Sequence, residues 1–335
     1  MFIFFILSLP FQLTKNSLSG SDILSFYKYP AMEHTVTTYY GYMLKLINIP
    51  YSPRWKGAIP NIFKPVVFIQ HGMTGSSDTF LLTGPSDGLP YMLADAGFDV
   101  WLGNSRGNTY SRKNKRLSPR RIRFWRFSWH EMGKEDIPAS IDYVLNKTRQ
   151  PALHYVGYSQ GCTVFLVMLS MRPEYVTKIK TTNLMQPPGL CRNLFLMVNP
   201  DSSNQMNRNV IGLLLKTHPA GISSRQLRHY MQLKQSKRFR MFDYGYKTNM
   251  LVYRNASPID YPLKYIQPQS PIHIYFSTKD DQATKKDILF LARRLYNRRL
   301  HQVPKAWSHK DFMFGCTVGR DLSMPILIAG STKEV

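Results

Sequence analysis

The sequence predicts an α/β protein with a mostly parallel central sheet and helices on both of its faces. Three observations predict this class. Short apolar runs typical of buried strands recur along the 335 residues, helical periodicity separates several of these runs, and a glycine-flanked serine joins one strand directly to a helix. The hydrophobic fraction of 43% allows a buried core, and the length suits one large domain that carries an insertion.

The glycine-flanked serine is Ser159, in the sequence Gly-Tyr-Ser-Gln-Gly at residues 157–161. The apolar run 153–156 predicts a buried strand, and residues 162–171 predict a helix. Strand, Gly-x-Ser-x-Gly and helix form a nucleophile elbow, a sharp turn whose glycines let strand and helix pass closely. The turn exposes the serine hydroxyl, and the backbone N–H of Gln160 at the helix start is expected to face an oxyanion. A chance Gly-x-Ser-x-Gly turn is the alternative interpretation.

An earlier buried strand, residues 65–70, leads into a glycine-containing turn at residues 71–77. In an α/β-hydrolase fold, a loop after an early strand supplies the second oxyanion donor as a backbone N–H. A glycine in this loop allows the backbone to approach a substrate carbonyl closely. We therefore expect the N–H of Met73 to be the second donor, with an ordinary glycine turn as the alternative.

The other predicted elements extend this pattern to the end of the chain. They are a hairpin within residues 33–50, helices at 89–96 and 131–146, and strands at 98–102, 178–185, 271–276 and 300–303. Residues 186–269 lack the alternation and predict an inserted, mostly helical cap, whose Met and aromatic side chains either line an apolar pocket or form its own core. We therefore expect a core built from residues 20–185 and 270–335, interrupted by a cap at 186–269.

A serine nucleophile needs an imidazole base and a carboxylate that orients the imidazole. In this fold the acid and then the histidine follow the serine, on loops after late strands. Asp280 and Asp281 follow the strand at 271–276, and both are candidates for the acid. His309 follows the last predicted strand and is the candidate base, because His301 lies within that strand. A turn with surface acids and a surface histidine are the alternative interpretations.

Positive charge dominates the composition, with 44 Lys and Arg against 20 Asp and Glu and a formal charge of +24. Such an excess favours an anionic partner, such as nucleic acid, an anionic membrane or an acidic matrix, although an ordinary basic surface fits equally. Residues 112–126 hold eight of these cations, interleaved with aromatic residues. Three interpretations stay open: a solvated loop, an anionic lipid contact or stacking on nucleic-acid bases. The sequence contains no recognised nucleic-acid module, so we expect no nucleic-acid partner.

The first 11 residues form an apolar run that is too short to span a membrane and typical of the core of a signal peptide. Small residues follow at Ser17, Ser19 and Gly20, so we interpret residues 1–19 as a signal peptide, with a buried N-terminal strand as the alternative. Two sequons agree with export and are candidates for N-glycosylation, at Asn146 and Asn255.

The three cysteines, Cys162, Cys191 and Cys316, show no Cys-x-x-Cys or Cys/His spacing. The sequence therefore predicts no metal site, and at most one disulfide is possible.

With these motifs the chain resembles the acid lipases, the family of gastric and lysosomal acid lipase, and particularly its insect members. The resemblance covers about residues 22–315 and rests on seven long segments: Tyr29-Pro-Ala-Met-Glu-His-Thr-Val-Thr-Thr, Gln70-His-Gly-Met-Thr-Gly-Ser-Ser-Asp, Trp101-Leu-Gly-Asn-Ser-Arg-Gly-Asn-Thr-Tyr-Ser, Phe127-Ser-Trp-His-Glu-Met, Ser170-Met-Arg-Pro-Glu-Tyr, His218-Pro-Ala-Gly and Trp307-Ser-His-Lys-Asp-Phe. It implies an α/β-hydrolase fold with a nucleophile at Ser159, a base at His309 and oxyanion donors at Met73 and Gln160.

The resemblance also selects between the two candidate acids. In these lipases the triad aspartate is followed seven residues later by an Asp before an aliphatic residue. Asp280 meets this pattern with Asp287-Ile288, and Asp281 does not. The family further implies hydrolysis of fatty-acyl esters, such as triacylglycerols or steryl esters, without a metal or organic cofactor. We expect a monomer, secreted or lysosomal, that acts at a lipid droplet or a membrane interface, and the positive charge would suit an anionic one.

Four features depart from the family pattern. Tyr158 replaces a usual histidine, and Asp281-Gln282 replaces an apolar pair. Between Pro187 and Cys191 the chain lacks several dozen residues with which the family begins its cap and lid, so we expect a shortened cap. A catalytically impaired lipid-binding or carrier protein is therefore the alternative function. Residues 319–335, with a proline and a glycine, depart from the expected final helix.

Overall fold

The computed structural model describes residues 18–54, 64–187, 205–280, 282–304 and 306–331. In this part of the chain the strands are β1 (Met32–Thr37), β2 (Tyr42–Ile49), β3 (Val66–Gln70), β4 (Asp99–Gly103), β5 (Lys113–Asn114), β6 (Leu153–Tyr158), β7 (Ile179–Met185), β8 (Ile272–Phe276) and β9 (Arg298–Gln302). They form one sheet in the order β1-β2-β4-β3-β6-β7-β8-β9, with β5 paired to β2.

Most of this sheet is parallel. The strands from β4 to β9 in the sheet order pair in parallel, whereas β1, β2 and β5 pair antiparallel at one edge. Strands β3 and β6 are buried along their whole length, which explains why their sequences are mainly apolar instead of alternating. The predicted α/β class with a mostly parallel sheet is confirmed.

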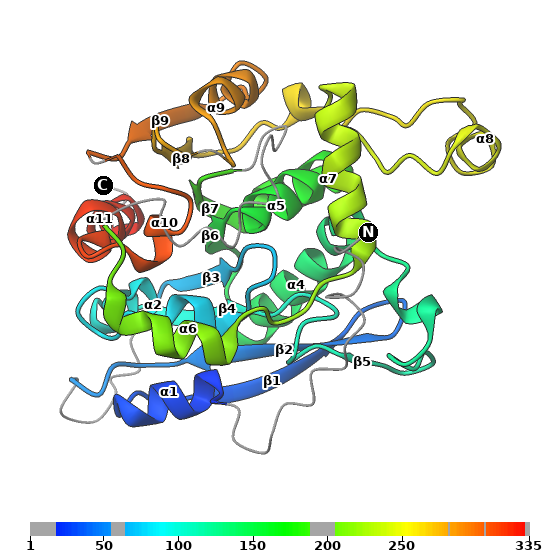
Figure 1. The fold of residues 1–335 in the computed structure, drawn as a ribbon. Coiled ribbons are helices and arrows are strands. Elements are labelled where there is room, and N and C mark those ends of the chain that lie inside the picture. Colours follow the sequence, from blue (N-terminus) through cyan, green and yellow to red (C-terminus); the bar gives the residue numbers. More distant parts are fainter. Residues whose placement is uncertain (1–17, 55–63, 188–204, 281, 305, 332–335) are drawn as a thin grey trace.

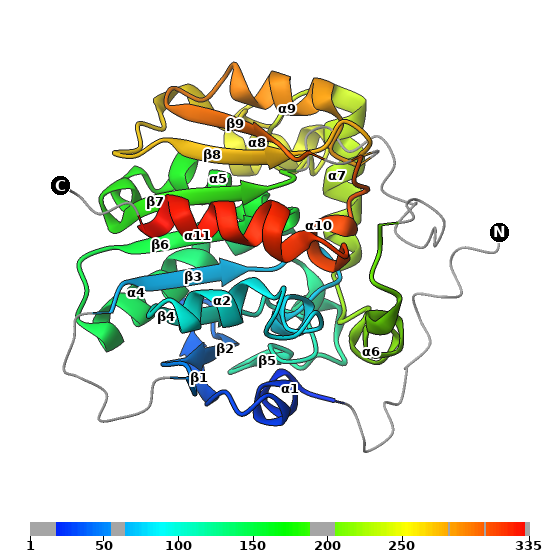
Figure 2. The ribbon, with the colours of Figure 1, turned by 90° about the vertical axis from the view of Figure 1, so that its left-hand side faces the viewer.

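Helices cover both faces of the sheet, as Figures 1 and 2 show. The described helices are α1 (Gly20–Phe26), α2 (Leu89–Asp95), α3 (Trp129–Glu131), α4 (Ile137–Thr148), α5 (Gln160–Met171), α6 (Ile211–Thr217), α7 (Ser224–Ser236), α8 (Tyr246–Tyr253), α9 (Lys285–Ala292), α10 (Asp311–Phe314) and α11 (Met324–Ser331). One buried cluster packs α4 and α5 against the sheet, and a second packs α2 and α11 against the opposite face. None of the helices in the described residues has the length and hydropathy of a membrane span.

The expectation that the C-terminal segment departs from a final helix is wrong. A π turn at Gly319–Ser323 continues into α11, which ends at Ser331. Pro325 is the second residue of α11 and directly follows the π turn, so its missing N–H falls where the helical hydrogen-bond pattern changes from π to α. Leu322 and Ile326 then join the buried cluster of α2, so apolar packing holds the segment in place.

Residues 205–269 contain the helices α6, α7 and α8 and add no strand to the sheet. Figure 1 shows α7 beside α5 and α8 extending away from the sheet. The position at which we expect the cap to be shortened, between Pro187 and Cys191, lies mainly outside the described residues. Most of the predicted signal peptide also lies outside them, at residues 1–17.

Candidate active site

Ser159 lies at the junction of β6 and α5 and adopts a strained backbone conformation, with φ +52° and ψ −116°. The flanking glycines are sterically required. A Cβ at Gly157 would lie 2.9 Å from the backbone nitrogen of Cys162, and a Cβ at Gly161 would lie 2.3 Å from the carbonyl oxygen of Gln70. Because these contacts involve backbone atoms, no side-chain movement relieves them. The sharp turn predicted from the Gly-x-Ser-x-Gly pattern is therefore present.

Three buried side chains from distant parts of the chain form one line of hydrogen bonds. His309 Nε2 lies 2.8 Å from Ser159 Oγ, and His309 Nδ1 lies 2.7 Å from Asp280 Oδ2. Since a carboxylate only accepts, Nδ1–H is the donor to Asp280 and Nε2 is the acceptor for the serine hydroxyl. Asp280 follows β8 and His309 follows β9, so the parallel sheet brings both loops to the elbow. Asp281 lies outside the described residues.

The environment of Asp280 favours its ionised form. Burial alone would raise the pKa of this carboxyl, but the attraction and hydrogen bond of His309, together with two backbone hydrogen bonds, lower it. The N–H groups of Gln282 and Ala283 also donate to Asp280 Oδ1, at 2.7 and 2.9 Å. The net effect is a pKa below the ordinary value for aspartate. Asp280 is therefore a carboxylate over the neutral pH range, able to hold the imidazole in one tautomer.

Tyr158 supports His309, a role that sequence reasoning missed. Its hydroxyl donates to the carbonyl oxygen of His309 at 2.8 Å, and the two rings lie 5.3 Å apart. On the other side of the same loop, the N–H and hydroxyl of Ser308 donate to Asp311 at 2.6 and 2.7 Å. The departure from the family histidine was visible at Tyr158, but nothing in the sequence pointed to a contact with residue 309.

The loop that carries Met73 packs directly against the elbow. A Cβ at Gly72 would lie 3.0 Å from the Cβ of Ser159, so this glycine permits a close approach. In the described chain, no acceptor is bonded to the backbone N–H of Met73 or of Gln160. Two free N–H groups on segments that flank a serine hydroxyl are the parts from which an oxyanion hole is built.

His71 fixes the shape of this loop. Its Nε2 accepts the N–H of Ser105 at 3.0 Å, so Nδ1–H donates to the carbonyl of Gly72 at 2.7 Å. Burial lowers the pKa of His71 to about 4 and keeps the ring neutral. Sequence reasoning missed this histidine too; its place directly before the glycine at the end of a buried strand was the available signal.

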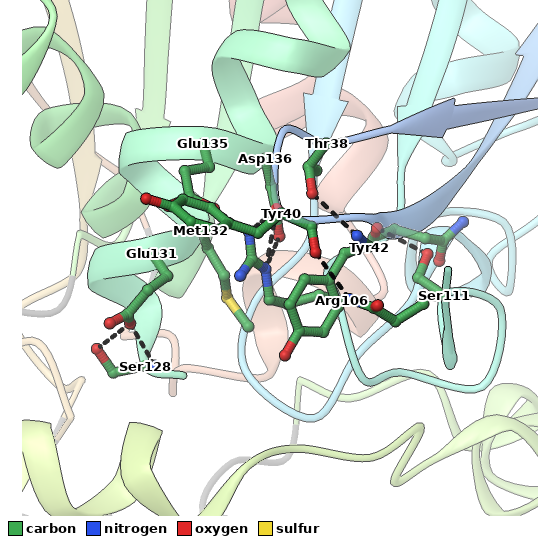
Figure 3. Close-up of polar contacts among 12 residues, drawn as sticks. Thr38, Tyr40, Tyr42, Arg106, Ser111, Ser128, Glu131, Met132, Glu135 and Asp136 are labelled. Carbon is green, nitrogen blue, oxygen red and sulfur yellow. Dashed lines mark hydrogen bonds and ion pairs between the residues drawn. The ribbon is translucent and has the colours of Figure 1, made fainter. Parts of the chain in front are cut away.

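The segment that supplies Ser105 is anchored by a buried ion pair, shown in Figure 3. Arg106 Nε lies 2.9 Å from both carboxylate oxygens of Asp136, Nη2 lies 2.9 Å from Glu135, and the guanidinium stacks 4.1 Å from the ring centroid of Tyr42. Burial alone would lower the pKa of Arg106, but the attraction of the two carboxylates raises it, so the residue stays charged. The pair joins the loop that holds Ser105 to the π turn before α4.

Helix α7 touches the elbow through buried polar side chains. Gln160 Nε2 donates to Gln226 at 2.9 Å, and the hydroxyl of Tyr230 donates to Thr163 at 3.0 Å. His229 stacks on Trp129 with the ring centroids 3.6 Å apart. These contacts fix α7 against α3 and α5, beside one of the two free N–H groups.

The remaining predicted residues lie at the surface. Asn146 is exposed near the end of α4, and Asn255 is exposed in the turn after α8, where its Oδ1 accepts the N–H of Ser257 at 3.3 Å. Among the described residues there is no group of three His, Cys, Asp or Glu side chains that could hold a metal ion.

Comparison with known proteins agrees with this geometry. The family described as "alpha/beta hydrolase fold" matches residues 65–315, and the "partial alpha/beta-hydrolase lipase region" matches residues 20–84. Lipase 1 of Drosophila melanogaster is 34% identical over 95% of this chain and 81% of its own length. Gastric triacylglycerol lipase of Rattus norvegicus is 33% identical over 89% and 88%. Lysosomal acid lipase/cholesteryl ester hydrolase of Macaca fascicularis is 31% identical over 90% and 88%.

Solved structures support the fold. A putative lipase from Acinetobacter baumannii aligns with a TM-score of 0.54 at 14% identity, over 95% of this chain and 99% of its own. The sequence matches, together with the sheet order and the elbow, establish that the chain belongs to the acid lipases of the α/β-hydrolase family and is a lipase, a carboxylic ester hydrolase.

Proposed function

We propose that this lipase cleaves fatty-acyl esters, such as triacylglycerols or steryl esters, with Ser159, His309 and Asp280 as its catalytic triad. The observation that carries the proposal is the unbroken line of hydrogen bonds from the Ser159 hydroxyl through His309 to Asp280. This arrangement activates a hydroxyl that is otherwise a weak nucleophile at neutral pH.

In the acylation step, His309 Nε2 accepts the proton of Ser159 while Oγ forms a bond to the ester carbonyl carbon. The carbonyl oxygen becomes an oxyanion, and the N–H groups of Met73 and Gln160 donate to it, each contributing about 3 kcal/mol. The intermediate then collapses, the bond to the alcohol breaks, and the alkoxide leaves with the proton from His309. The product is an acyl-enzyme on Ser159 and a free alcohol or diacylglycerol.

In the deacylation step, the same imidazole accepts a proton from water, and the hydroxide attacks the acyl carbon. The bond to Ser159 Oγ breaks, His309 returns the proton to the serine, and the fatty acid leaves. Asp280 remains ionised throughout, holds the Nδ1–H tautomer and stabilises the imidazolium of both steps.

The names of the relatives support the substrate class, since one is a triacylglycerol lipase and another a cholesteryl ester hydrolase. We propose that residues 186–269 act as the cap of this site, because α7 meets the elbow at Gln160. We further propose a monomer acting at a lipid interface, secreted or lysosomal, as the gastric and lysosomal relatives suggest.

The test measures hydrolysis of emulsified triacylglycerol and cholesteryl ester by the full chain and by Ser159→Ala. The expected result is fatty-acid release that falls by roughly 10³-fold or more in the variant. A carrier on the same fold, the alternative raised by the shortened cap, would bind the lipids without releasing fatty acid. Equal release from both proteins would also reject the assignment of Ser159.

A further inference from the structure

A dense group of cations lies on the surface beside the first hairpin of the sheet. Residues 112–126, here called the basic segment, hold eight Lys and Arg residues, and all eight are exposed. The chain has no Asp or Glu between residues 100 and 130. Within the described residues, none of the eight side chains forms an ion pair.

The carboxylates that follow this stretch are already engaged elsewhere. Glu135 and Asp136 are bonded to the buried Arg106, and Glu131 accepts the N–H and hydroxyl of Ser128 (Figure 3). Because these three carboxylates are bonded to Arg106 or Ser128, they do not neutralise the cations of the basic segment. Its positive field therefore extends into solvent, where it attracts an anionic partner.

Two of the aromatic residues of this region are not available to such a partner. Phe124 and Phe127 are fully buried in the core, and Phe124 packs against Tyr42 with the ring centroids 5.2 Å apart. Stacking of nucleic-acid bases needs exposed ring faces, so these two rings cannot stack on bases.

Other apolar side chains do face outward next to the cations. Ile122 in the basic segment is 73% exposed, and Tyr39 and Tyr40 in the turn between β1 and β2 are 92% and 61% exposed. The turn and the segment are joined, since Asn114 donates to the carbonyl of Tyr40 at 3.1 Å. Exposed tyrosines among Lys and Arg are typical of protein surfaces that contact lipid headgroups.

The basic segment is also connected to the active site. The carbonyl of Ala220 accepts a hydrogen bond from Arg112 at 3.3 Å, and its N–H donates to the carbonyl of Thr74, next to Met73, at 2.7 Å. Further along, the hydroxyl of Ser223 donates to the carbonyl of Trp125 at 2.7 Å. Ala220 thus links the basic segment directly to the loop that carries Met73, because it is bonded to Arg112 through its carbonyl and to Thr74 through its N–H.

We propose that the basic segment, with Tyr39 and Tyr40, is a docking surface for the face of an anionic phospholipid bilayer. The lipid phosphates and carboxylates supply the missing counter-charge, while the two tyrosines and Ile122 enter the headgroup layer. Docking places the Ala220 side of the site toward the lipid. The binding itself does not depend on the proposed hydrolysis, so the two ideas fail separately.

The experiment uses the full chain carrying Ser159→Ala, so that vesicles are not consumed, and measures cosedimentation with phosphatidylcholine vesicles with or without about one third phosphatidylserine. The test variant adds Lys115→Gln, Arg116→Gln, Arg120→Gln and Arg123→Gln. The matched control instead adds Lys285→Gln, Lys286→Gln, Arg293→Gln and Arg299→Gln, which removes four exposed cations around α9 and β9. Circular dichroism melting verifies that each protein is folded.

We expect binding that requires phosphatidylserine, weakens with salt, falls about 100-fold or more in the test variant and falls less than about threefold in the control. An equal fall in both variants would mean that net charge alone drives binding. That result would overturn the proposal. Binding that does not depend on phosphatidylserine would also overturn it, as would tighter binding to duplex DNA than to the vesicles.

Discussion

Tyr158 offers a direct way to perturb His309, the proposed catalytic base, without changing a residue of the proposed triad. Its hydroxyl donates to the carbonyl of His309 at 2.8 Å in a buried setting. The change Tyr158→Phe removes one oxygen, keeps the ring beside the imidazole and leaves a buried carbonyl without its donor. Because the lost contact is made to the backbone of residue 309, the effect reaches the position of the imidazole.

The magnitude follows from two separate costs. Leaving a buried carbonyl unpaired costs about 1–3 kcal/mol, which for 335 residues lowers the melting temperature by roughly 1–4 °C. A misplacement of about 1 Å in a catalytic group reduces the rate by up to roughly 10²-fold. Since the ring contact and the bond to Asp280 remain, we expect the imidazole to move by less than this. The expected fall in kcat is about tenfold, with KM unchanged.

The assay compares kcat and KM on a soluble short-chain ester with calorimetric melting. Tyr91→Phe is the matched control. Tyr91 lies on helix α2, and its buried hydroxyl also donates to a backbone carbonyl, that of Leu81. It should lower the melting temperature by a similar amount and leave kcat unchanged. The reasoning is refuted if Tyr158→Phe keeps full kcat, or if both variants lose kcat equally.

Three further predictions concern the cap contact, pH and glycosylation. Gln226→Leu breaks the bond to Gln160 and should lower kcat several-fold. Gln226→Glu keeps an acceptor for Gln160 Nε2 and should restore part of the activity. An unchanged kcat in Gln226→Leu would contradict a role for this bond beside the proposed oxyanion donor. Burial lowers the pKa of three neutral histidines from 6.5 to about 4, 4 and 3, at His71, His218 and His229. Between about pH 6.5 and 4 the unfolded chain then binds protons that the folded chain does not, so the melting temperature should fall as pH decreases; a flat profile would argue against neutral burial. After expression in a secretory host, peptide mass spectrometry should find carbohydrate at Asn255, in an exposed turn, in preference to Asn146, within a helix; the reverse occupancy would contradict this reading.

The predicted site residues that the structure brings together are those that a local pattern or the chain order indicates. The turn at Ser159 needs glycines two positions away on each side, and the steric contacts at Gly157 and Gly161 justify that pattern. His309 was predicted from chain order, because a parallel sheet brings successive loops to one edge. The choice of Asp280 over its neighbour needed the family pattern, since both carboxylates follow the same strand.

What the sequence could not predict depends on contacts between distant segments. The bond from Tyr158 to residue 309 spans 151 positions, and the bond from Gln160 to Gln226 spans 66. No periodicity or spacing encodes such pairs. The C-terminal helix was missed for a different reason: a proline usually interrupts a helix, and only the structure shows that a π turn precedes Pro325 and continues into α11.

The central claim is that Ser159 is the nucleophile, and covalent titration with a fluorophosphonate tests it most directly. The account predicts one adduct per chain, located by peptide mass spectrometry on Ser159, no adduct in Ser159→Ala and much slower labelling in His309→Ala. An unlabelled native chain, or an adduct that persists in Ser159→Ala, would contradict it.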